Sequence, residues 1–112
     1  MKPTSKSDLA AAIDLLWVRF LPEIRDRVAI LESAAAALAA GGLTDSQRDA
    51  ANDAAHKLAG TLGTFDLTRG TVLARELELH YSGDADPALA EQLASITAEL
   101  RSIIDSRKDG PR

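Results

Sequence analysis

The sequence has no cysteine, and aromatic residues make up only 4% of its 112 residues. Without cysteine, neither a disulfide framework nor a thiolate metal site can form. With so few aromatic rings, the core must be built from the aliphatic residues that dominate the 46% hydrophobic share. Alanine and leucine are good helix formers, so the composition favours an all-α fold. The length suits one domain with a single core.

A basic cluster and a long apolar run are also missing. The net charge is −4, and no group of lysines and arginines forms a stripe that could follow a phosphate backbone. The N-terminal region is interrupted by Asp14, Arg19 and Pro22, and it offers no small-residue cleavage site. We therefore expect no nucleic-acid partner, no signal peptide, no membrane segment and a cytoplasmic location.

Hydrophobic periodicity and stop signals predict five helices. The first is expected over residues 8–20 and ends near Pro22, which either breaks a helix or begins a new one. The second is expected to end at the glycine pair 41–42. The apolar stripe of the first helix is Leu9, Ile13, Leu16 and Phe20, and that of the second is Ile24, Val28, Leu31, Ala35 and Leu38.

The remaining three helices have start signals of their own. Thr44 and Gln47 predict a capping box for the third helix, Asp66 can cap the fourth, and Asp86 with Pro87 opens the fifth. The expected stripes are Ala51, Ala55, Leu58, Leu62 and Phe65; then Leu73, Ala74, Leu77 and Tyr81; then Leu89, Leu93, Ile96, Leu100 and Ile103. Short connections between such helices predict an antiparallel up-and-down four-helix bundle with an additional N-terminal helix. The expected divisions are a covering helix over 1–21, the bundle over 22–105 and a polar tail over 106–112.

His56 stands out because two glycines follow it at the spacing of helical turns. At about 100° per residue, its side chain lies about 140° from the middle of the apolar stripe of the third helix, so it faces outward. Gly60 and Gly63 lie on the same side, where they leave the ring uncovered, although each costs a helix about 1 kcal/mol. The plain alternative is a solvated surface histidine beside two incidental glycines.

The stretch "HKLAGTLG" then resembles the signature of histidine-containing phosphotransfer (HPt) domains of bacterial phosphorelays. The matching residues are His56, Leu58, Gly60, Thr61 and Gly63, and "LARELE" over 73–78 resembles the next helix of the family. The family usually has lysine three residues after the histidine, where this chain has Ala59. This departure leaves the rate of transfer and the choice of partner open.

The resemblance implies that His56 accepts a phosphoryl group from an aspartyl phosphate on a receiver domain and passes it to another receiver. The expected partners are receiver domains of response regulators or hybrid kinases, and Mg²⁺ is expected on the receiver, with no cofactor or metal on this chain. A monomer without kinase or ATPase activity of its own is expected. The residues expected at the docking surface and site entrance are Asn52, Asp53, Lys57, Ala59, Gly60 and Gly63, with Asp49 beside them.

Three other functions remain to be weighed. A catalytically silent adaptor of the same fold would bind receivers without accepting phosphate. The dimerisation helices of a histidine kinase usually have an acidic residue and a proline after the histidine, where this chain has Lys57 and Leu58. A helical metal-binding bundle places Glu-x-x-His motifs inward, whereas Asp53 and His56 are expected to point outward. Arg69, Arg75, Glu76 and Glu78 are interpreted as a solvated face, and His80 as a residue near a helix end.

Overall fold

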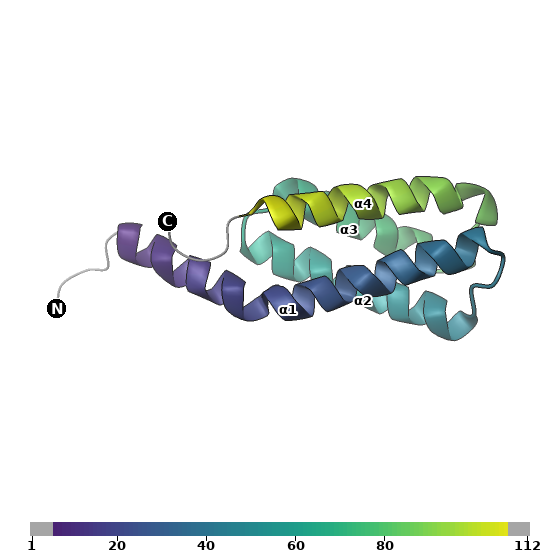
Figure 1. Cartoon of the computed structure of the whole chain (residues 1–112), viewed down its shortest axis with the longest axis horizontal. Coiled ribbons are helices and arrows are strands. Elements are labelled where there is room, and N and C mark those ends of the chain that lie inside the picture. The colour runs from purple at the N-terminus through teal and green to yellow at the C-terminus, as the bar shows by residue number, and fades with distance from the viewer. Residues whose placement is uncertain (1–5, 108–112) are drawn as a thin grey trace.

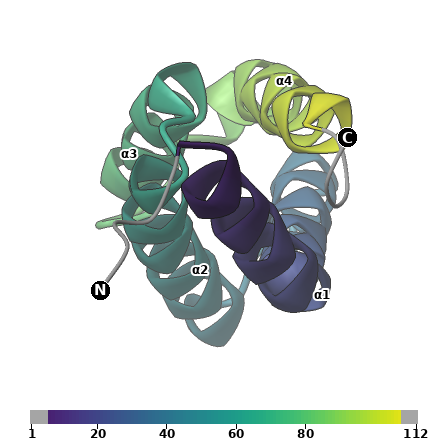
Figure 2. The same ribbon diagram turned by 90° about the vertical axis from the view of Figure 1, so that its left-hand side faces the viewer.

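The computed structural model describes residues 6–107, which form four α-helices and one short 3₁₀ helix (Figure 1). The elements are α1 (Lys6–Ala39), α2 (Asp45–Thr64), α3 (Thr68–His80), η1 (Pro87–Leu89) and α4 (Ala90–Ser106). α1 packs against α2 and α4, and α3 packs against the same two helices, so the four surround one core (Figure 2). The all-α bundle expected from composition and periodicity is confirmed. Within residues 6–107, no helix has both the length and the apolar character needed to cross a bilayer.

The helix boundary expected at Pro22 is wrong, because α1 is one continuous helix of 34 residues with Pro22 inside it. The additional N-terminal helix is therefore the first half of α1, and it extends beyond the ends of the other helices (Figure 1). Proline removes the hydrogen bond that would reach the carbonyl of Val18. Pro22 and Val18 are both exposed, so water can solvate that carbonyl and the helix continues.

Continuity of α1 also changes which residues of its first half reach the core. Trp17 and Leu21 are buried, whereas Leu9, Leu16 and Phe20 of the expected stripe are exposed and only Ile13 packs partly against the core. The deeply buried second half of α1 sets the helical phase. Trp17 and Leu21 precede the buried Ile24 by seven and three residues, which places them on the same face. Trp17 packs between α1 and the bundle, with its ring edge-on to that of Phe65 and the two ring centroids 5.2 Å apart.

The other apolar stripes are confirmed with one shift. Every residue expected to face the core from the second, third and fourth predicted helices is buried. In α4 the buried face contains Ile104 and Thr97, while Ile96 and Ile103 are only partly buried. The hydroxyl of Thr97 donates to the carbonyl of Leu93 at 2.7 Å, which is how a polar residue is accommodated on this face.

Local contacts at the helix ends define where α1 ends, where α2 begins and ends, and where α3 begins. The capping box is present: the amide of Gln47 donates to the Thr44 hydroxyl, and the Gln47 side chain accepts from the Thr44 amide. Gly41 ends α1 with a φ of 74°. The cap expected at Asp66 is wrong, since Asp66 has a φ of 58° and Leu67 precedes α3 without a side-chain cap. The turn is so short that Asp66 instead takes the left-handed position that ends α2, with the amide of Leu67 donating to the carbonyl of Leu62.

Arg101 of α4 holds Glu32 of α1 through two hydrogen bonds of 2.7 and 2.9 Å, and these lower the pKa of the Glu32 carboxyl. A carboxyl whose pKa is lowered by folding stabilises the folded state above its unfolded pKa, and this contribution is lost as the pH falls through the folded pKa. Glu32→Gln should therefore reduce the free energy of unfolding by about 0.5 kcal/mol at pH 7, because both side chains are more than a third exposed. Urea titrations should show the two proteins converging as the pH falls below 4.5, the ordinary pKa of this carboxyl. If the difference in the free energy of unfolding stayed constant down to strong acid, the ionised Glu32 carboxylate would not be its cause.

Candidate functional site

His56 lies in the middle of α2 with its side chain 65% exposed. The residues that face the core from the same helix include Ala55 and Leu58, so the helix itself turns His56 away from the interior. The outward orientation expected from helical geometry is confirmed. An exposed imidazole has one nitrogen available to a visiting molecule if the other is occupied by the protein.

The occupied nitrogen is Nδ1, which lies 2.8 Å from Oε2 of Glu78 on α3. A carboxylate can only accept, so Nδ1 carries the hydrogen and Nε2 keeps its lone pair when the ring is neutral. The backbone at Glu78 is tied to α2 by a second contact, because the side-chain amide of Asn52 donates to the backbone carbonyl of Glu78 at 2.8 Å. Arg75 lies 3.6 Å from the other carboxylate oxygen of Glu78. The ring is therefore held in one tautomer with Nε2 outward.

The next turn of α2 leaves this nitrogen accessible. A methyl group added at Gly60 would have no neighbour within 4 Å, and one added at Gly63 would lie 3.6 Å from the Thr71 hydroxyl oxygen. Neither glycine is therefore required by packing inside the bundle. Gly60 is part of the wall of an open hollow of about 440 Å³ beside the ring, lined by Arg27, His56, Lys57, Gly60, Thr61 and Thr64.

The other residues expected at the entrance have different positions. Ala59 is only 1% exposed, because three residues beyond His56 the helix faces α3, where the Ala59 carbonyl accepts from the Thr71 hydroxyl at 3.4 Å. The expectation that Ala59 forms part of an accessible surface is wrong. Lys57 and Asp53 are on the surface and paired with each other at 3.0 Å. Asn52 is partly buried, and its side-chain amide donates to the backbone of Glu78 on α3 instead of lying on the outer surface.

Two residues near His56 were not found from the sequence. The sequence pattern assigns Glu78 to a solvated face, and it gives no signal for Arg27, which lies 29 positions before His56. Only the packing of α3 and α1 on α2 brings Glu78 to the ring and Arg27 to the hollow beside it. A polar residue at helix spacing gives no signal of which neighbouring helix it meets, so neither contact could be read from one sequence.

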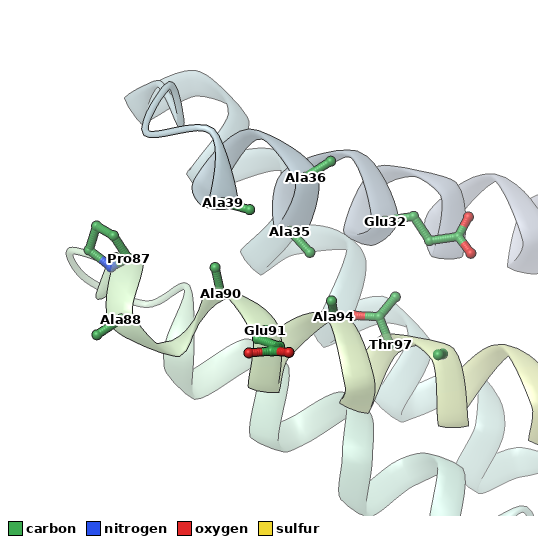
Figure 3. Close-up of a pocket in the computed structure, with 11 residues that line it drawn as sticks. Glu32, Ala35, Ala36, Ala39, Pro87, Ala88, Ala90, Glu91, Ala94 and Thr97 are labelled. Carbon is green, nitrogen blue, oxygen red and sulfur yellow. The ribbon is translucent and has the colours of Figure 1, made fainter.

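A larger hollow of about 640 Å³ lies between α1 and α4, away from His56. Ala35 of α1 and Ala90 and Ala94 of α4 point toward one another across it (Figure 3). Of its polar side chains, Glu32 is engaged by Arg101 and Thr97 donates to a backbone carbonyl. It contains no nucleophile, so the smaller hollow at His56 is the candidate site. Among residues 6–107, no three His, Cys, Asp or Glu side chains gather so that they could hold a metal ion.

Comparison with known proteins gives one family and one curated relative. The family model described as "Hpt domain" matches residues 15–106. The chain is 34% identical over 103 residues to Protein RcaC from Microchaete diplosiphon. The aligned region covers 90% of this chain and 16% of RcaC. The chain thus spans about a sixth of the length of this relative. No solved structure gives a significant match. The range matched by the family model, 15–106, contains His56, Glu78 and Arg27.

Proposed function

The chain belongs to the Hpt domain family, whose members transfer phosphoryl groups through histidine in phosphorelays, and on this premise we propose that His56 is the phosphoacceptor. We further propose that it receives the group from the aspartyl phosphate of one receiver domain and passes it to another. The observation that carries the proposal is the exposed ring whose Nδ1 is bound to Glu78, which leaves Nε2 as the nitrogen for a partner. The proposal includes that the receiver, and not this chain, binds the Mg²⁺ used in transfer.

The forward step needs only a lone pair and a fixed direction. Nε2 of neutral His56 attacks phosphorus in line with the bond to the aspartyl oxygen. The N–P bond forms as the P–O bond breaks, and the electron pair of that bond remains on the receiver carboxylate. Phosphoryl transfer depends mainly on positioning and on charge stabilisation, so little covalent activation is required from this chain.

Glu78 stabilises the charge that the ring gains in this step. After attack, the imidazole holds the phosphoryl group on Nε2 and its original hydrogen on Nδ1, so the ring is formally cationic. The Glu78 carboxylate, 2.8 Å from Nδ1, lies where it can stabilise that charge. In the reverse step, a carboxylate oxygen of the next receiver attacks phosphorus, and the N–P electron pair returns to Nε2.

A receiver must approach over the flat turn around Gly60. Exposed Lys57 and Asp53 flank the ring on α2, and the exposed apolar side chains of Leu16 and Phe20 lie on the flank of α1 that leads to Arg27. These side chains support docking of a partner that presents its own reactive group in a cavity.

Gly60→Ala tests whether the glycine serves access rather than packing. The free energy of unfolding should rise by up to about 1 kcal/mol, since alanine is the better helix former and the new methyl group meets no neighbour. Transfer from a receiver should nevertheless slow by roughly 10-fold, because a displacement of about 1 Å from the attack geometry is costly. Urea unfolding and a rapid-quench transfer assay measure the two effects.

The matched control for this variant is Gly83→Ala, at a loop glycine where an added methyl group also meets no neighbour. It should leave the transfer rate unchanged. If Gly60→Ala were more stable and fully active, the proposed approach over this turn would be wrong.

The experiment that tests the proposed function is incubation with a receiver carrying ³²P-labelled aspartyl phosphate. Label should move to this chain in an acid-labile, alkali-stable form, as expected of a phosphoramidate. It should then move on to a second, unlabelled receiver. The silent adaptor would bind the phosphorylated receiver and acquire no label, which would overturn the proposal.

A further inference from the structure

Arg27 of α1 is the cation that enters the hollow beside His56 from a neighbouring helix. Its side chain is 19% exposed, compared with 52% for Lys57, which follows His56 on α2. Arg27 is therefore held between helices, whereas Lys57 extends into solvent. The sole ion-pair partner of Arg27 among the described residues is Glu23, one turn earlier on α1, whose Oε1 accepts from Nη2 at 2.7 Å.

This arrangement leaves donors available to a new acceptor. A guanidinium has five N–H donors in a planar fork, and the bond to Glu23 uses one nitrogen. Nη1 and Nε remain for another oxyanion. Glu23 does not line the hollow at His56, so its carboxylate holds Arg27 from one side and leaves the hollow itself without a negative charge from this pair.

Phosphorylation brings a strong negative charge into this hollow. A phosphoryl group carries a charge of about −1.5 to −2 at pH 7 and three acceptor oxygens. Lys57 is the other cation lining the hollow, and it is already paired with Asp53. Arginine binds phosphoryl oxygens through two parallel donors, whereas lysine acts as a point charge.

Resting on the proposed phosphorylation of His56, we propose that Arg27 binds the phosphoryl oxygens on Nε2 and stabilises the phosphorylated form of this domain. α1 thus supplies the neutralising charge across the helix interface. Arg27 touches the transferred group directly, so it sets how the phosphoryl group is distributed between this domain and the receiver.

The test is the equilibrium partition of ³²P label between this domain and its receiver, measured for matched variants. Arg27→Gln should shift the partition toward the receiver by about 10-fold, as expected for loss of one charge-assisted hydrogen bond. Arg27→Lys should recover part of the shift. Glu23→Gln should leave the partition unchanged or move it toward this domain. The control is Arg25→Gln on the same helix, whose partner is Asp105 of α4, and it should match wild type.

A second measurement excludes a purely structural effect and a docking effect. Wild type and variants are phosphorylated without a receiver, using phosphoramidate, from which ammonia leaves as the N–P bond to His56 forms. The ³¹P resonance of the phosphohistidine is then followed against pH. In Arg27→Gln the midpoint pH at which the phosphoryl group takes up its last proton should rise by about half a pH unit, because a neighbouring cation has been removed. Arg25→Gln should show no shift.

The outcomes separate this inference from the function on which it rests. If wild type accepts no label from the receiver and none from phosphoramidate, both proposals are overturned. If wild type is phosphorylated on His56 while Arg27→Gln and Arg25→Gln both behave as wild type, the role of Arg27 alone is overturned. Circular dichroism of each variant verifies that the helical bundle is intact.

Discussion

Replacing His56 with glutamine is expected to reduce phosphoryl transfer to background, a loss of several orders of magnitude. Glutamine is similar in length and polar, but its amide nitrogen has no lone pair available for attack on phosphorus. The side chain is 65% exposed and packs on nothing in the core, so the free energy of unfolding should change by no more than about 0.5 kcal/mol. The measurement is transfer of ³²P from a labelled receiver, followed at seconds and at hours.

His80→Gln is the matched control, because His80 is the second of the two histidines in the chain. It lies at the end of α3, away from the hollow at His56. This variant should accept label at the wild-type rate. If label persisted in His56→Gln and vanished in His80→Gln, the phosphoacceptor would be His80 on α3, and the proposal for His56 would be wrong.

Glu78→Ala should slow transfer by roughly 10-fold to 100-fold, the range expected for loss of a hydrogen bond to a group that becomes charged. Without the carboxylate 2.8 Å from Nδ1, the ring is free to turn and to exchange tautomers, and the cationic product loses its counter-charge. Glu78→Gln should be intermediate, since its amide oxygen still accepts from Nδ1 but carries no charge. Single-turnover transfer rates distinguish the two contributions.

Glu76→Gln provides the comparison for Glu78, because Glu76 is an exposed carboxylate on the same helix. It should transfer at the wild-type rate. The binding of an unphosphorylated receiver should be the same for all three glutamate variants. Equal losses for Glu76→Gln and Glu78→Gln would mean that the charge of α3 matters as a whole and that the contact with His56 does not.

Most of the fold could be predicted because its information is local. The steps of three and four between Ala51, Ala55 and Leu58 fix which side of α2 is buried, and this in turn fixes where His56 points. Capping at Thr44 and termination at Gly41 likewise depend on a few adjacent residues. The family signature around His56 is equally local, which is why one sequence was enough to select the candidate phosphoacceptor.

The errors at Pro22, in the first half of α1 and at Glu78 came from features that depend on distant parts of the chain, whereas those at Asp66 and Ala59 were local. Whether Pro22 ends a helix depends on whether water reaches the carbonyl that it leaves unbonded, and hence on the direction in which the core lies. The phase of the first half of α1 follows from the second half, which made Trp17 a core residue in place of Leu16. The partner of His56 comes from α3 and a further wall of the hollow from α1, so Glu78 and Arg27 become visible only when the bundle is assembled.

Trp17 gives the molecule an intrinsic optical probe. It is the single tryptophan in the chain, fully buried, edge-on to Phe65 and covered by the guanidinium of Arg107 at 4.9 Å. Its emission therefore reports the joining of three distant segments: the first half of α1, the end of α2 and the residue after α4. Because this contact lies outside the hollow at His56, fluorescence can follow unfolding of the bundle without being altered directly by the chemistry on the imidazole.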